Sequence, residues 1–169
     1  SKFQALAAEA DTLDGLSTSA AIIDEIHAHK TRRVWDVIKT STSARRQPLQ
    51  VGITTAGFDR KTLCYELYQR GVQILEGAYE EDSFFCYIAE IDKDDSWQDE
   101  ACWPKANPNL GVSKKWEYMR DEFRAARTSP AYQNTFRRLD LNQWTEQSSR
   151  AIDMDEWHAC AGQVDPEDL

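Results

Sequence analysis

The chain has 169 residues, of which 41% are hydrophobic, 11% aromatic and 29% charged, and its formal net charge is −9. This apolar content can form one hydrophobic core and argues against an intrinsically disordered chain. The acidic balance argues against a protein that wraps nucleic acid on a broad basic surface, because such proteins neutralise phosphates with clustered Lys and Arg.

The cysteines and the apolar runs indicate a cytoplasmic, soluble protein. Cys64, Cys86, Cys102 and Cys160 are widely spaced and form no CxxC pair, which favours free, mostly buried thiols over a zinc site. No apolar run approaches the roughly 20 residues that cross a bilayer, and nothing resembles a signal peptide. We therefore expect no membrane contact.

The first third of the chain predicts a helix end, a turn and a strand. Residues 3–10 are typical of the tail of a helix, and Asp14-Gly15 indicates a turn. The apolar run at 20–24 predicts a strand that is buried on both faces of a parallel sheet. A helix is expected over 31–39, where apolar residues recur at helical spacing.

Three further elements complete an alternating pattern. Residues 49–55, LQVGITT, predict a second strand that Ala56-Gly57 ends with backbone freedom. A helix over 60–77, with Leu75 among its inward residues, precedes a third buried strand over 84–91. Strand, helix, strand, helix, strand is the order of parallel crossovers, so the first two-thirds of the chain is expected to be α/β.

A helical part is expected after residue 91. The acidic run 92–100 predicts a solvated loop, and the turn-rich stretch around WPKANPN predicts a connection. Two amphipathic helices should follow, with periodic aromatics that we interpret as core residues. Their apolar faces are formed by Trp116, Met119 and Phe123 in the first helix and by Tyr132, Phe136 and Leu139 in the second.

Two adjacent acids follow the first strand in the run SAAIIDEIHAHK. Strands of a parallel sheet deliver side chains to ligand at their carboxyl ends. In an ATPase, Asp24 would hold Mg²⁺ through its water shell, and Glu25 would orient and deprotonate the water that attacks the γ-phosphate. The alternative is an ordinary strand end that opens an acidic loop.

Other side chains could complete such a site. Thr54 and Thr55 end the second strand and could sense the γ-phosphate, although threonines also simply favour strands. Arg45 and Arg46 could offer a cation to phosphate, in the same or a neighbouring subunit, or contact DNA; paired surface arginines are also often solvated. His27, next to the acids, is interpreted as a helix-start or packing residue rather than a metal ligand.

Five segments in this order resemble the large terminase subunit of tailed bacteriophages over nearly the whole chain. They are DEIHAHK, ARRQPL, ITTAG, WPKANPNLG and FRRLDLNQW. The resemblance implies a RecA-like, P-loop NTPase sheet with flanking helices and then a small helical linker subdomain. It also implies a DNA-packaging motor in the cytoplasm of a bacterial host, where ATP hydrolysis with Mg²⁺ drives double-stranded DNA into the procapsid.

The resemblance also assigns residues and partners. Asp24 matches the Walker B magnesium acid, Glu25 matches the catalytic glutamate, and Ile53-Thr54-Thr55, followed by Gly57, matches the coupling motif. Implied partners are double-stranded DNA, the portal protein and the small terminase subunit, with a ring of identical subunits on the portal.

The chain departs from the family pattern in two respects: no GxxxxGK[ST] loop occurs in it, and the metal-binding carboxylate cluster of the family's nuclease is not recognisable. We therefore interpret 1–95 as the second half of the ATPase domain and 96–169 as the linker subdomain, with nuclease sequence expected only beyond about Trp157. Such a chain should be inactive alone. The alternatives are a superfamily 2 helicase, since Asp24 to His27 read as DExH, and a non-catalytic prophage remnant that serves as an interaction module.

Overall fold

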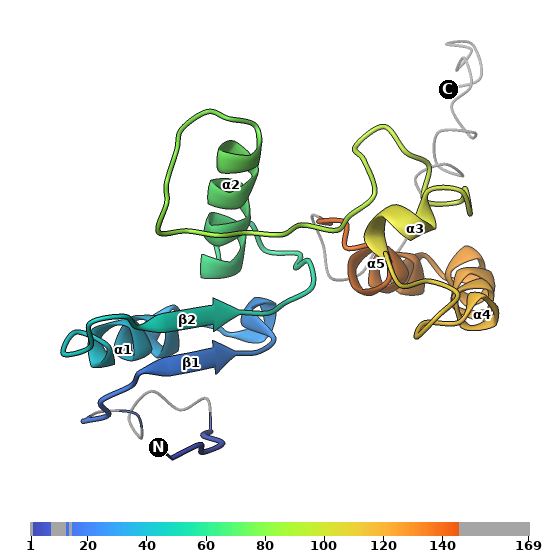
Figure 1. Cartoon of the computed structure of the whole chain (residues 1–169). Helices are drawn as coiled ribbons and strands as arrows, with labels where there is room; N and C mark the ends of the chain where they lie inside the picture. The colour runs from blue at the N-terminus through green and yellow to red at the C-terminus, as the bar shows by residue number, and fades with distance from the viewer. Residues whose placement is uncertain (1, 8–12, 14, 146–169) are drawn as a thin grey trace, which may run out of the picture. The chain divides into compact units, whose positions relative to one another are not determined.

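The computed structural model describes residues 2–7, 13 and 15–145 (Figure 1). Two compact units follow one another along the chain, unit 1 from Ser1–Ile88 and unit 2 from Ala89–Leu169. Unit 1 combines a small parallel sheet with helices, which confirms the expected α/β class, and the described part of unit 2 is helical. In the described residues, no helix has the length and apolar character needed to cross a membrane.

In the described residues of unit 1, the sheet has two parallel strands, β1 (Ala20–Ile23) and β2 (Leu49–Gly52). Ala20 lies opposite Leu49, and Ile23 lies opposite Gly52. Parallel neighbours cannot be joined by a tight turn, and helix α1 (Arg33–Ser41) supplies the crossover between them. Both strands were predicted, but β2 ends at Gly52 rather than at residue 55.

Only one face of this sheet is well covered by described residues. Ile23 and Ile38 are buried, whereas the side chain of Ile22, on the opposite face of β1, is 65% exposed. Leu49 at the start of β2 is 58% exposed. The prediction that the first strand is buried on both faces is therefore wrong for the described chain, because no second layer covers Ile22.

Helix α2 (Leu63–Leu75) begins at Thr62, whose side-chain oxygen accepts a hydrogen bond from the Tyr65 backbone N–H at 3.4 Å. It is shorter at both ends than the helix expected over 60–77. Leu75, predicted to face inward, is 60% exposed because it lies in the last turn of the helix. At the other end of the chain, residues 2–7 are not helical, so the expected helix tail over 3–10 is wrong where it is described.

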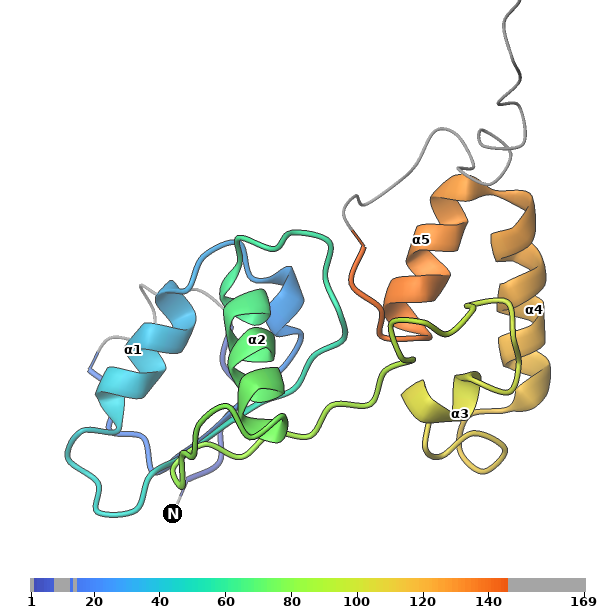
Figure 2. The same cartoon turned by 90° about the horizontal axis from the view of Figure 1, so that it is seen from above.

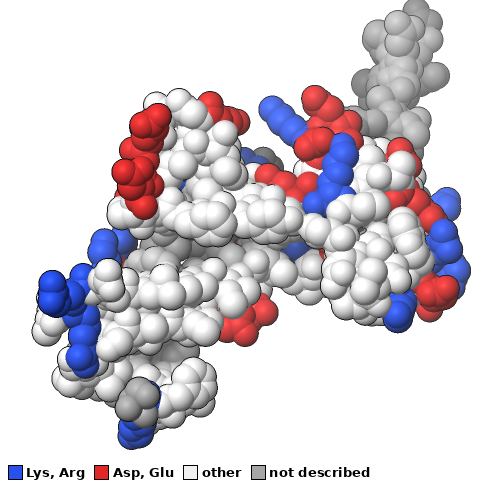
Figure 3. All heavy atoms as spheres, in the orientation of Figure 1, with Lys and Arg blue, Asp and Glu red and all other residues white. Residues whose placement is uncertain are grey.

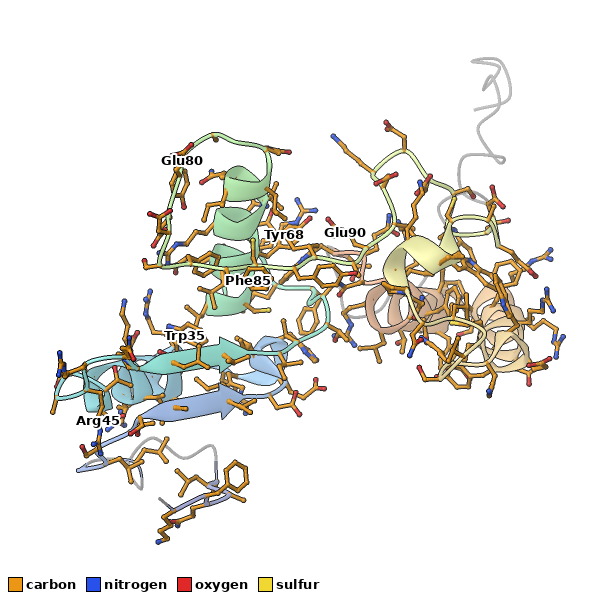
Figure 4. The ribbon with its side chains drawn as sticks, viewed as in Figure 1. Trp35, Arg45, Tyr68, Glu80, Phe85 and Glu90 are labelled. Atoms are coloured by element: carbon orange, nitrogen blue, oxygen red, sulfur yellow. The ribbon has the colours of Figure 1, made fainter. Side chains whose placement is uncertain are left out.

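The third predicted strand, 84–91, is not a strand. Its side chains alternate as in a strand: Phe84 lies over the Arg70 guanidinium at 4.3 Å and the Cys86 thiol lies 3.5 Å from the Gly71 carbonyl oxygen, whereas Phe85 is 90% exposed. The segment thus packs against α2, and Figure 4 shows Phe85 on the extended stretch of chain that passes this helix. A strand needs a continuous ladder with a neighbour, and among the described residues this segment forms only isolated bonds of that kind, such as that from the Ile91 N–H to the Leu141 carbonyl oxygen at 3.4 Å.

Up to residue 145, unit 2 contains three helices: α3 (Trp103–Ala106), α4 (Trp116–Thr128) and α5 (Pro130–Leu139). Helices α4 and α5 lie side by side in both views (Figure 1, Figure 2). They confirm the two predicted amphipathic helices, whereas α3 was expected to be an irregular connection. Leu139 is 42% exposed, so the inward position predicted for it is wrong.

The core of unit 2 is aromatic. Trp103 is fully buried, and its ring lies 5.3 Å from Phe123 and 5.9 Å from Phe136, both in edge-to-face geometry. Its indole N–H donates to the Trp97 carbonyl oxygen at 3.1 Å, which satisfies the polar group of this buried ring. The prediction that the periodic aromatics form a core is confirmed.

The acidic run after residue 91 is more ordered than a solvated loop. Lys105 on α3 forms ion pairs with Asp92 at 2.5 Å and with Asp95 at 2.7 Å, and Arg120 on α4 pairs with Glu100 at 2.8 Å. The Lys105 ammonium holds the pKa of Asp95 below its ordinary value. Ion pairs thus hold the acidic run against α3 and α4, and the prediction of a solvated loop is wrong in part.

Candidate functional site

Asp24 and Glu25 follow β1 directly, at the carboxyl end of the parallel pair. Both side chains are exposed. Figure 3 shows acidic side chains at this end of the sheet and basic side chains at its opposite end. The Glu25 backbone N–H donates to Asp24 Oδ1 at 2.9 Å. This bond orients the Asp24 carboxylate and leaves it exposed, which suits a hard cation that prefers oxygen ligands and keeps part of its water shell.

The backbone of Glu25 has an unusual conformation, with φ 53° and ψ 46°. This left-handed region is uncommon for residues other than glycine, and it costs about 1–2 kcal/mol for a side chain with a Cβ atom. The bend directs the chain from β1 into the short 3-10 turn η2 (Ile26–Ala28). Backbone strain of this kind concentrates at functional sites.

The coupling-motif residues lie beside the acids. Beyond the strand ends, the Ile53 N–H donates to the Ile23 carbonyl oxygen at 2.9 Å, and the Ile26 N–H donates to the Ile53 carbonyl oxygen at 3.4 Å. These bonds continue the pairing of the two chains and place Thr54 next to η2. Of the motif, Thr54 is exposed and Thr55 half-buried, and Gly57 after it is buried.

His27 contacts residues that follow both strands. Its backbone N–H donates to Thr54 Oγ1 at 3.0 Å, and its ring Nδ1 lies 3.2 Å from Glu25 Oε2. The sequence interpretation gave His27 only a helix-start or packing role, because its contact with Thr54 spans 27 positions along the chain. The signal that could have identified it is its place in the Asp-Glu-x-His pattern.

Arg45 and Arg46 lie away from the acids. Arg45 donates a hydrogen bond from its guanidinium to the Ser17 carbonyl oxygen at 2.6 Å, before the start of β1. Figure 4 shows Arg45 at the amino ends of the strands, whereas Asp24 and Glu25 follow the carboxyl end of β1. The structure thus brings together the acids and the threonines, and it places the arginine pair at the opposite end of the same sheet.

The thiols and the metal-ligating side chains of the described residues form no further site. Cys64, Cys86 and Cys102 are free thiols, and Cys160 lies outside the described residues. Burial raises the pKa of the Cys64 thiol, so it stays protonated near neutral pH. Among residues 2–7, 13 and 15–145, no three His, Cys, Asp or Glu side chains group in a way that could hold a metal ion.

Two family models together match nearly the whole chain. The model of the terminase large subunit endonuclease domain matches residues 78–169, more than half of the chain, and that of the terminase large subunit ATPase domain matches residues 1–71. The chain belongs to the terminase large subunit family. The resemblance noted in the sequence is therefore confirmed, and membership decides against the helicase alternative.

Named relatives agree with this terminase assignment. The chain is 34% identical over 147 residues to Protein YmfN of Escherichia coli K12, covering 87% of this chain and 32% of YmfN. It is 30% identical over 162 residues to the terminase large subunit of Enterobacteria phage HK97, covering 94% of this chain and 31% of that protein. The crystal structure of the HK97 large terminase superposes with a TM-score of 0.68 and 28% identity, covering 86% of this chain and 30% of that one.

The match of the endonuclease model corrects one expectation. Nuclease sequence was expected only beyond about Trp157, whereas the endonuclease-domain model begins at residue 78. The view that this terminase chain carries no nuclease-domain sequence therefore conflicts in part with the match. The region after Trp157 lies outside the described residues. The chain spans about a third of the length of the relatives named above.

Proposed function

We propose that this chain carries the water-activating acid and the coupling motif of a terminase ATPase. The observation that supports this most directly is the meeting of Glu25, at the end of β1, with Thr54, at the end of β2, on His27. The carboxyl ends of adjacent parallel strands are where nucleotide-binding sheets place their chemistry. The alternative of an ordinary acidic strand end does not account for the strained backbone of Glu25.

Each residue has a distinct role in this proposal. Asp24 holds Mg²⁺ through water, and Glu25 orients the attacking water and accepts its proton. Bound Mg²⁺ would supply charge neutralisation at the phosphates. Ile53, Thr54 and Thr55, followed by Gly57, form the coupling motif, which responds to the state of the nucleotide next to Glu25.

Arg45 and Arg46 are proposed to act outside this catalytic site. They lie at the amino ends of the strands, whereas Asp24 and Glu25 follow the carboxyl end of β1. Arg45 and Arg46 therefore cannot reach a γ-phosphate that these acids of the same chain hold. They can still bind a phosphate of DNA, or a phosphate of a nucleotide that is bound to a neighbouring subunit. Arginine suits either, since its guanidinium binds phosphate oxygens through two parallel hydrogen bonds.

The activity of the whole protein is proposed from family membership. The terminase that contains this sequence would form a ring on the portal, work with the small terminase subunit, and use ATP hydrolysis to move double-stranded DNA into a procapsid. RecA-like topology is part of this proposal. So is the division into the second half of an ATPase domain, 1–95, and a following subdomain, 96–169.

The test is ATP hydrolysis by the full-length protein that carries this sequence. We expect E25Q to retain nucleotide binding and to lose hydrolysis by roughly 10²- to 10⁴-fold, because Gln cannot accept the proton of the water. D24N should instead raise the concentration of Mg²⁺ that hydrolysis requires. Wild-type protein that does not hydrolyse ATP, or E25Q protein that does so at the wild-type rate, would contradict the proposal; the first result would support the non-catalytic remnant.

A further inference from the structure

His27 occupies a position between the acid of β1 and the threonines of β2. It lies in η2, two residues after Glu25, and its side chain is only 13% exposed. Its ring Nδ1 lies 3.1 Å from Thr54 Oγ1 and 3.4 Å from Thr55 Oγ1. The same atom lies 3.2 Å from Glu25 Oε2. One ring nitrogen is thus within reach of three side chains from two different strand ends.

The donors and acceptors around His27 favour a proton on Nδ1. The Thr54 hydroxyl accepts from the His27 backbone N–H at 3.0 Å and donates to the Thr55 carbonyl oxygen at 2.9 Å, so its own proton is already used. An ionised Glu25 carboxylate can only accept. The contacts of Nδ1 are therefore favourable when Nδ1 carries a proton and donates it, as in the Nδ1–H tautomer or the imidazolium.

The network continues into helix α2. Thr54 Oγ1 lies 3.6 Å from Cys64 Sγ, and Cys64 is buried in the first turn of α2, with 3% of its surface exposed. A path of direct contacts thus runs from Glu25 through His27 and Thr54 to Cys64. Since α2 follows the coupling motif along the chain, a change at Glu25 can reach a whole helix through two side chains.

We propose that His27 is a positioning residue that holds the Glu25 carboxylate against Thr54 and Thr55. It fixes the direction of the acid for water activation and ties the acid to the coupling motif and α2. This inference rests on the proposed role of Glu25 as the acid that activates water. The sequence alone gave His27 no such role.

The first experiment measures steady-state ATP hydrolysis by the full-length protein. We expect H27A to lower kcat by roughly 10- to 100-fold, with the KM for ATP within about twofold, because the acid is misaligned while nucleotide binding is left intact. H27N places an amide N–H near the position of Nδ1 and should restore most of kcat. H27Q places its amide near Nε2 instead and should not, which makes it the matched control.

A double-mutant cycle tests whether His27 and Thr54 act as one unit. T54V should also lower kcat, and H27A/T54V should be little worse than the poorer single variant, since either change breaks the same link. Wild-type kcat in H27A, equal activity of H27N and H27Q, or fully additive losses would each overturn the inference. E25Q separates the two proposals: if E25Q is active, the proposed function itself is wrong, whereas an inactive E25Q beside an active H27A overturns only the role of His27.

A spectroscopic measurement on this chain keeps the inference testable even if a variant folds poorly in the assay. Long-range ¹H–¹⁵N spectra of the chain labelled at its three histidines report which ring nitrogen carries the proton. We expect His27, assigned by loss of its signals in H27N, to be protonated at Nδ1 and to shift in E25Q and in T54V. A neutral ring protonated only at Nε2 would overturn the proposal, because Nδ1 could then not donate to Glu25.

Discussion

Glu25 combines a functional side chain with a backbone conformation that does not suit it. A left-handed conformation costs about 1–2 kcal/mol for a residue with a Cβ atom, and glycine adopts it without that cost. Glycine would lose the carboxylate, so the position retains strain for the sake of the side chain. Proteins commonly trade stability for activity at such positions.

Replacement of Glu25 should show this trade directly. We expect E25G to be more stable than E25A by about 0.5–1 kcal/mol, because the relief of strain exceeds the extra chain entropy of glycine. Both variants lack the carboxylate, so the difference between their stabilities reports the effect of the Cβ atom at this position. Native-state hydrogen exchange of the β1 amides measures it. Lower protection in E25G than in E25A, as chain entropy alone would give, would mean that Glu25 carries no strain.

At the scale of single residues, the sequence predicted positions better than partners. It placed Asp24 and Glu25 at a strand end, and they lie there, because an apolar run followed by acids is a local pattern. It did not predict the bonds of His27, since these join residues 27 positions apart through a fold that local patterns do not define. The separation of Arg45 from the acids follows from the parallel direction of the strands, which the sequence did predict, so it could have been inferred from the pattern.

At the scale of elements, Gly52 shows how α1, β2 and η2 fit together. A Cβ atom added at Gly52 would lie 2.4 Å from Ile26 Cδ1 and 3.2 Å from the Trp35 ring. Figure 4 shows Trp35 next to β2. Since Ile26 belongs to η2, directly after Glu25, the lack of a side chain at Gly52 lets the turn that carries the acid site pack closely on β2.

We expect G52A to destabilise unit 1 by about 1–3 kcal/mol through overpacking. I26V removes the Cδ1 atom that would clash and should cost about 0.5–1.5 kcal/mol alone. The double variant G52A/I26V should lose clearly less than the sum of the two. Hydrogen exchange of the β2 amides measures all three, and additive losses would show that Ile26 does not limit the space at Gly52.

The connection between α4 and α5 makes a pH-dependent contribution to stability. The Tyr132 hydroxyl donates to the Glu122 carboxylate, and this bond, assisted by burial, raises the pKa of Tyr132 to about 12. The folded chain keeps this proton between about pH 10 and 12, where the unfolded chain loses it. The contribution is therefore fully present below about pH 10 and is lost as the pH rises toward 12.

An alkaline titration should resolve this tyrosine from the others. Near-ultraviolet absorbance of the phenolate should show a component near pH 12 in the wild type, absent from Y132F and moved toward pH 10 in E122A. The other tyrosines serve as internal references in the same spectra. A wild-type titration with no component above that of Y132F would show that the bond to Glu122 does not persist in solution.

Helices were easier to predict than strands for a physical reason. The apolar spacing of α4 and α5 reports their own geometry, since a helix satisfies its backbone hydrogen bonds internally. Residues 84–91 have a sequence suited to a strand, but a strand exists only beside another strand. Phe85 is 90% exposed and Tyr87 is 73% exposed because the alternate side chains, Phe84 and Cys86, already pack on α2.

At the scale of the whole molecule, the chain corresponds to only part of the length of its relatives. It covers about a third of the relatives it matches, and family models for both the ATPase and the endonuclease domain align with it. The sequence indicated the family because several motifs occur in the right order. It misplaced the start of nuclease-related sequence, because a domain boundary depends on contacts rather than on a motif.

Nucleotide binding by this 169-residue chain alone should be weak. Most of the electrostatic grip on a nucleotide comes from the backbone N–H groups and the lysine of a phosphate-binding loop, and no GxxxxGK[ST] sequence occurs here. The exposed carboxylates of Asp24 and Glu25 repel a polyphosphate. Titration calorimetry with Mg²⁺ and ATP should therefore show no saturable binding at micromolar concentrations.

The variant D24N/E25Q is the control for this measurement. It should not bind ATP either, because the lack of a phosphate-binding loop limits the affinity more than the repulsion by the two carboxylates does. Micromolar binding by the wild-type chain would contradict this prediction and would require a phosphate site built from other residues.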